Sequence, residues 1–123
     1  MTTMQITGTV EGGKHVGHTL GFPTANIRPE PTGQDLPMHG VYAGTIRIED
    51  EMKWWQCLIN YGMQPTIPSG RETIEVYILD FKRNIYAATV TLQFTKYIRA
   101  EHKFDSVDEL KAQILLDIES VRG

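Results

Sequence analysis

The stretch YAATVTLQFTKY, residues 86–97, decides the fold class because apolar and polar residues alternate along it. Every second residue from Ala88 to Phe94 is apolar, and the residues between them are Thr or Gln. Successive side chains on a β-strand point to opposite faces, so a period of two predicts a strand with one buried face and one polar face. The stretch therefore predicts a half-buried strand of a sheet.

Four further runs are rich in β-branched residues and are bounded by Gly, Pro, Asn or Asp, which is typical of short strands. They are Met4–Val10, Gly40–Ile48, Lys53–Tyr61 and Thr73–Phe81. Several of the links between runs are short, which favours antiparallel neighbours. Five or six antiparallel strands in a small chain usually close into a barrel, because closure removes unpaired sheet edges. The residues alone thus favour an all-β barrel.

One helix is predicted, at about 106–122. Ser106 followed by Glu109 is a capping-box pattern, and Asp108 adds negative charge to the first turn. Apolar residues then recur at helical spacing, which predicts one buried face made of Val107, Leu110, Ile114, Leu115, Ile118 and Val121. We expect this helix to pack on the barrel.

Length and composition restrict the class of protein. A chain of 123 residues, with 41% hydrophobic and 22% charged residues, predicts a single globular domain over 1–123. A formal net charge of −3 argues against a nucleic-acid partner, and no apolar stretch reaches the about 18 residues of a membrane helix. A single cysteine, Cys57, excludes an internal disulfide and a multi-cysteine zinc site. We expect a soluble, cytoplasmic protein.

A glycine-rich segment, GGKHVGHT at residues 12–19, nearly fits the phosphate-binding P-loop pattern. His18 stands where that pattern needs Lys, and Pro23 breaks the helix that should follow. The P-loop interpretation is therefore rejected, although glycines still let backbone amides approach an anion. A mobile turn is an equal alternative. His15 and His18 have no third ligand nearby in the sequence, which disfavours a metal pair.

Five segments, in order along the chain, resemble the riboflavin kinase (flavokinase) family. The segments are GHTLGFPTAN at 17–26, GVY at 40–42, NYGMQPT at 60–66, TIEVYILDF at 73–81 and IRAEHKF at 98–104. The likeness is to the bacterial type, which often forms the C-terminal part of a bifunctional FAD synthetase. It implies a six-stranded antiparallel closed barrel with a C-terminal helix, in agreement with the periodicity.

The resemblance also implies an activity and a set of site residues. The activity is Mg²⁺-dependent transfer of the ATP γ-phosphate to the ribityl 5′-hydroxyl of riboflavin, giving FMN and ADP. The resemblance implies Glu75 as general base and Thr24 with Asn26 as Mg²⁺ ligands, which suit a cation that prefers oxygen. It implies contacts to the ATP phosphates from Gly12, Gly13, Lys14, Gly17, His18, Pro23, Thr24 and Asn26. It implies contacts to the flavin from Asn60, Thr66, Arg99 and Phe104.

Three positions depart from the family pattern. His18 stands where Arg is usual, Tyr61 where a small or branched aliphatic residue is usual, and Tyr77 where His is common. The alternatives are a catalytically inactive flavin-binding or regulatory barrel and a small interaction module. The retained Thr24, Asn26 and Glu75 favour the kinase over both. We expect a monomer, or part of a larger bifunctional chain, that makes FMN and no FAD.

Overall fold

The computed structural model describes residues 4–11, 24–30, 35–63, 72–102 and 104–123. Six strands and one helix form within these ranges. They are β1 (Met4–Glu11), β2 (Ala25–Pro29), β3 (Gly40–Ile48), β4 (Trp54–Met63), β5 (Glu72–Ile78), β6 (Thr89–Arg99) and α2 (Val107–Arg122). Among these residues no helical segment has both the length and the apolar character that crossing a bilayer requires.

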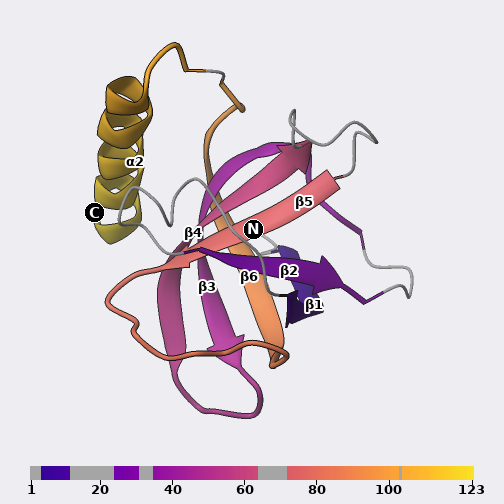
Figure 1. Cartoon of the computed structure of the whole chain (residues 1–123). Helices are drawn as coiled ribbons and strands as arrows, with labels where there is room; N and C mark the ends of the chain where they lie inside the picture. Colours follow the sequence, from indigo (N-terminus) through magenta and orange to yellow (C-terminus); the bar gives the residue numbers. More distant parts are fainter. Residues whose placement is uncertain (1–3, 12–23, 31–34, 64–71, 103) are drawn as a thin grey trace.

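The strands close into a barrel in the order β1-β2-β5-β4-β3-β6, and every neighbouring pair is antiparallel. Figure 1 shows α2 lying beside β3 and β4, on the side of the barrel away from β1 and β2. The predicted fold class is confirmed. Because β2 lies between β1 and β5, segments far apart in the sequence become direct neighbours.

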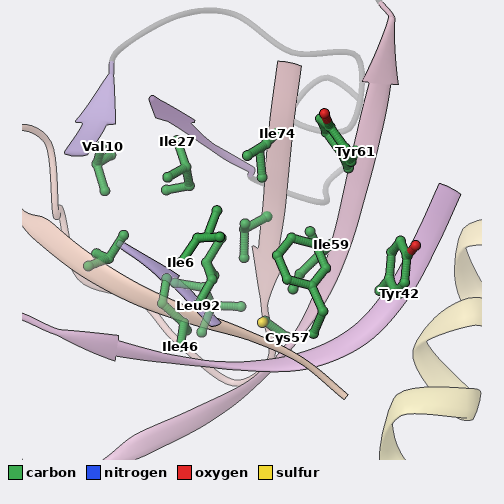
Figure 2. Packing of buried hydrophobic residues seen from close by; sticks show 14 of the residues in the cluster. Ile6, Val10, Ile27, Tyr42, Ile46, Cys57, Ile59, Tyr61, Ile74 and Leu92 are labelled. Carbon is green, nitrogen blue, oxygen red and sulfur yellow. The ribbon is translucent and has the colours of Figure 1, made fainter. Parts of the chain in front are cut away.

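The barrel interior is filled by inward-pointing side chains from all six strands, as Figure 2 shows for part of the cluster. The alternation predicted for β6 is confirmed, since Val90, Leu92 and Phe94 are buried in this interior. Cys57 is also fully buried there, and the burial raises the pKa of its thiol. A second, smaller cluster lies between the barrel and α2, and consists of Val41, Ala43, Leu58, Leu79 and Val121.

The strand β2 was not predicted from the residue pattern, which placed it within long loops. Only Ile27 of its five residues is buried, and Pro29 cannot donate a ladder hydrogen bond. Its strand conformation comes from pairing with β1 and β5, which is a tertiary effect. The short segment matters because it carries Asn26.

Two predicted strands were too long, and both errors lie at the β5–β6 connection: the run 73–81 extends past the end of β5, and the run 86–97 starts before β6. Asp80 and Ala87 adopt positive φ angles of 56° and 67°, which a continuous strand does not allow. The strand β5 therefore ends at Ile78, and β6 begins at Thr89. Leu79 stays attached to the sheet because its amide donates to the Gln56 carbonyl at 3.0 Å.

The helix α2 begins as predicted. The Glu109 amide donates to Ser106 Oγ at 3.1 Å, and the Glu109 carboxylate accepts from the Asp105 amide at 3.3 Å. The predicted buried face is partly wrong, because Val107 and Leu115 are exposed. The helix contacts the barrel through Ile118 and Val121, and Asp117 is buried among these contacts.

Candidate functional site

Three polar residues from three neighbouring strands lie in one row across the sheet. In the register of the barrel, Glu75 of β5 is paired with Asn26 of β2 on one side and with Asn60 of β4 on the other. Directly paired residues of antiparallel strands point to the same face, with Cβ atoms about 4.5–5.5 Å apart. The structure therefore brings together residues that are 15 to 49 positions apart in the sequence.

This row lies on the outer face of the barrel. The residues on either side of Glu75, Ile74 and Val76, are buried in the interior, so Glu75 itself points outward. Asn26 and Glu75 are half-buried, while Asn60 is exposed. A carboxylate at this position is held rigidly by the sheet yet remains accessible to a ligand on the surface.

Two oxygen atoms beside Glu75 are buried and have no hydrogen-bond partner among the residues that the structure describes. They are Thr24 Oγ1, on the residue before β2, and Asn26 Oδ1. A buried oxygen left without a hydrogen bond destabilises a fold, so such an atom calls for a ligand. Hydroxyl and amide oxygens suit a hard cation, and Mg²⁺ completes its shell with water and phosphate oxygens. The residues present therefore fit Mg²⁺.

A polar hollow of about 460 Å³ lies on the β1 side of the same row. Its lining includes Glu11, which is the register partner of Asn26, together with Arg28 and the exposed ring of Tyr86. Sequence reasoning missed these residues because they come from three separate segments. The register that places Glu11 beside Asn26 is the signal that identifies them.

On the other side of the row, Arg99 is engaged in an ion pair. Its guanidinium contacts the buried Asp117 carboxylate of α2 through Nε, at 3.1 Å to both oxygens, and through Nη2 at 2.8 Å. Gln113 Nε2 donates to the same carboxylate at 2.9 Å. The observed partner of Arg99 is thus the helix, and its contact with the flavin stays a prediction.

Phe104 lies in the segment that leads from β6 to α2. The Arg99 guanidinium carbon is 5.7 Å from its ring centroid, and the His102 ring meets it edge to face at 4.7 Å. Phe104 is half-buried in this arrangement. This position is compatible with packing of the Phe104 ring on a flavin and equally with packing of the ring between α2 and the barrel.

The remaining predicted site residues lie outside the described residues. They are Gly12, Gly13, Lys14, Gly17, His18, Pro23 and Thr66. Their roles toward the ATP phosphates and the flavin stay predictions. Of the departures from the family pattern, Tyr77 is half-buried beside α2, where it packs against the second apolar cluster.

Tyr61, another departure, belongs to a polar network at one end of the barrel. Its hydroxyl donates to Glu72 at 3.0 Å, and the same carboxylate oxygen is 2.5 Å from His39 Nε2. Burial and the Glu72 charge raise the pKa of Tyr61 to about 12. The contacts with His39 and Tyr61 lower the pKa of Glu72. We call Tyr61, Glu72, His39 and Glu101 the end network, since His39 Nδ1 also lies 3.8 Å from Glu101.

Ionisation of Tyr61 is expected to destabilise the fold in alkali. Its folded pKa, about 12, lies above the ordinary value of 10.0, so its contribution is complete below pH 10 and is lost as pH rises toward 12. Burial also raises the pKa of Tyr42, so ultraviolet titration of tyrosinate should show late ionisation of both residues, and Tyr61→Phe should remove the part that belongs to Tyr61. Tyr86→Phe, at an exposed site, should leave the late ionisation unchanged. A late ionisation as large in Tyr61→Phe as in the parent would contradict the assignment.

Comparison with known proteins identifies relatives along the whole chain. A family model described as riboflavin kinase matches residues 1–123. The chain is 41% identical over 119 residues to a bifunctional riboflavin kinase/FMN adenylyltransferase of Haemophilus influenzae, covering 97% of this chain and 38% of that protein. This chain therefore spans well under half the length of that relative.

Solved structures share the fold. A Streptococcus pneumoniae protein described as a macrolide-efflux protein superposes with a TM-score of 0.88 at 32% identity, over 99% of this chain and 39% of that chain. Riboflavin kinase from Trypanosoma brucei superposes with a TM-score of 0.63 at 23% identity, over 99% of this chain and 79% of that one. Because the family model matches the chain from end to end, this protein belongs to the riboflavin kinase family of enzymes.

Proposed function

We propose that this chain is a riboflavin kinase domain that converts riboflavin and ATP into FMN and ADP, with Mg²⁺. The observation that carries the proposal is the pairing of Glu75 with Asn26 on the outer face, beside the oxygens of Thr24 and Asn26, which are buried and have no partner within the described part of the chain. A proton acceptor and two cation ligands in one place are what phosphoryl transfer to a hydroxyl requires. A binding protein without catalysis would not need both.

In this proposal Glu75 is the general base. Its carboxylate accepts the proton of the ribityl 5′-hydroxyl while that oxygen forms a bond to the γ-phosphorus. The bond between the γ-phosphorus and the oxygen that bridges to the β-phosphate breaks, and ADP leaves with the electron pair. A positioned side-chain base contributes about 10²–10⁴-fold to the rate of such a step.

Thr24 and Asn26 would hold the cation through the two oxygens described above. When bound, Mg²⁺ supplies positive charge that neutralises the phosphate oxygens of ATP. Two side-chain ligands are compatible with Mg²⁺ because it usually keeps several waters and phosphate oxygens. In this assignment Glu75 is not a cation ligand, and its carboxylate accepts the proton of the ribityl hydroxyl.

The two substrates would approach the row from opposite sides. The hollow lined by Glu11, Arg28 and Tyr86 would take part of the nucleotide, because it adjoins Asn26 and offers an exposed aromatic ring and the guanidinium of Arg28, which lies 3.4 Å from the Glu11 carboxylate. The flavin would lie toward Asn60 and the segment that carries Phe104. This order would bring the γ-phosphate of ATP and the ribityl hydroxyl of riboflavin together next to Glu75.

Removal of the two unpartnered oxygens tests the cation site. Thr24→Val and Asn26→Leu should each raise the Mg²⁺ concentration needed for half-maximal rate by about tenfold, the equivalent of ~1.4 kcal/mol. Thr45→Val, at a distant position on β3, is the matched control. Titration of the initial rate with Mg²⁺ at saturating ATP measures the effect. Unchanged Mg²⁺ dependence in both variants would place the cation elsewhere.

The proposed function is tested directly by chromatography of products after incubation with riboflavin, ATP and Mg²⁺. We expect FMN, a marked loss without Mg²⁺, and no FAD. Riboflavin bound tightly without FMN would favour the inactive flavin-binding barrel. Absence of both binding and turnover would favour the interaction module.

A further inference from the structure

The Glu101 carboxylate lies on the same outer face of the barrel as the row of Asn26, Glu75 and Asn60, but two residues further along β4. Asn60 and Gly62 are two apart on β4 and share this face, and Gly62 is paired with Thr73 as Asn60 is with Glu75. The Glu101 carboxylate lies directly on Gly62, where even a methyl group would overlap it. Glu101 belongs to the segment between β6 and α2.

His39 joins this carboxylate to the barrel. Its Nε2 lies 2.5 Å from Glu72 at the start of β5, and its Nδ1 lies 3.8 Å from Glu101. The edge of its ring packs against Tyr61 of β4, with centroids 4.7 Å apart. One imidazole therefore bridges three separate parts of the chain, just before β3 begins at Gly40.

We propose that His39 is a positioning residue for riboflavin: by bridging Glu72 and Glu101 it holds residues 100–102 across the face at Gly62, beside Glu75. This inference rests on the proposed function. The segment is anchored at one end by the Arg99–Asp117 ion pair and at the other by the Ser106 cap. Glu101 supplies the contact between these anchors, and Phe104 lies three residues beyond it.

The advantage is preorganisation. A binding segment that is already ordered in the free protein loses less conformational entropy when the ligand binds. The network should therefore act on the flavin, whose proposed position is beside this segment, and leave the nucleotide on the opposite side of the row unaffected. Glu101 and Gly62 belong to the same device, since the carboxylate fits there only because residue 62 has no side chain.

The test compares His39→Ala and Gly62→Ala with Met63→Ala, a control whose side chain is on the opposite face of β4. Both test variants should raise KM for riboflavin by about tenfold, or ~1.4 kcal/mol, with KM for ATP within twofold of the parent. Gly62→Ala matters because it displaces Glu101 without removing any polar group. Urea denaturation identifies a variant that simply fails to fold.

Amide hydrogen exchange of residues 98–102 in the free protein supplies a readout that needs no catalysis. We expect faster exchange there in both variants and no change in the control. Unchanged exchange, or faster exchange with an unchanged riboflavin KM, would overturn the inference, as would equal rises in both KM values. If the parent makes no FMN, the proposed function fails, and exchange together with riboflavin Kd from fluorescence still decides the role of His39.

Discussion

Replacement of Glu75 by Gln should lower kcat for FMN formation by ~100-fold or more, while riboflavin still binds with nearly its original Kd. The amide keeps the size of the side chain and its place in the row with Asn26 and Asn60, but it cannot accept the hydroxyl proton. The loss therefore falls on the chemical step rather than on binding. Initial rates at saturating substrates and a fluorescence titration of riboflavin measure the two quantities separately.

Two controls make this result specific to the base. Glu119→Gln, on the exposed side of α2, makes the same chemical change away from the row and should leave kcat unaltered. Glu75→Asp retains a carboxylate on a shorter side chain and should fall between the parent and Glu75→Gln. Turnover of Glu75→Gln near that of the parent would exclude Glu75 as the base, and another group would then have to take the proton.

Replacement of Asp117 by Ala should lower the free energy of unfolding by about 3 kcal/mol, the lower end for breaking a buried ion pair. Asp117 is 1% exposed and accepts from Arg99 and Gln113, so its removal leaves the guanidinium without a counter-charge. We take the lower end of the range for a buried ion pair because the Arg99 side chain is 22% exposed, so water can partly solvate its charge. Urea denaturation of parent and variant measures the change.

The control for this prediction is an exposed ion pair between the same helix and the connection that follows β5. Arg122 contacts Asp80 at 3.1 Å, but both side chains are exposed, so Asp80→Asn should leave the urea midpoint almost unchanged. The double replacement Arg99→Met with Asp117→Leu should be more stable than Asp117→Ala, because no charge is then left buried. A double variant as unstable as the single one would contradict this account.

The residues that fill the barrel interior could largely be predicted from the sequence. The period of two in residues 88–94 indicated which side chains of β6 are buried, and the same alternation is observed in β5, where Ile74 and Val76 lie inside and Glu75 lies outside. The alternation of apolar and polar residues is a local property, since it follows from the geometry of one strand and from the hydrophobic effect. The helix cap at Ser106 is equally local, and it too was predicted correctly.

The candidate site could be predicted from the sequence only in part. The likeness to a known family singled out Thr24, Asn26 and Glu75, but no local pattern indicated that they meet. Their meeting depends on β2, which has too few buried residues to be recognised as a strand and is shaped by its neighbours. Asp117 was missed for a related reason, because a charged residue on an apolar helix face is explained only by its partner on β6.

The fold class, the buried faces of the longer strands and the position of the helix could thus be predicted, because they follow from interactions between residues close in the chain. Which strands are neighbours, and which polar side chains face each other, became apparent only in the folded barrel. Strand pairing brings Asn26, Glu75 and Asn60 into one row, with Glu11 next to Asn26, and the folding of separate segments onto each other brings Tyr61, Glu72, His39 and Glu101 into the end network. Such contacts depend on the closure of the whole barrel, to which every strand contributes at once.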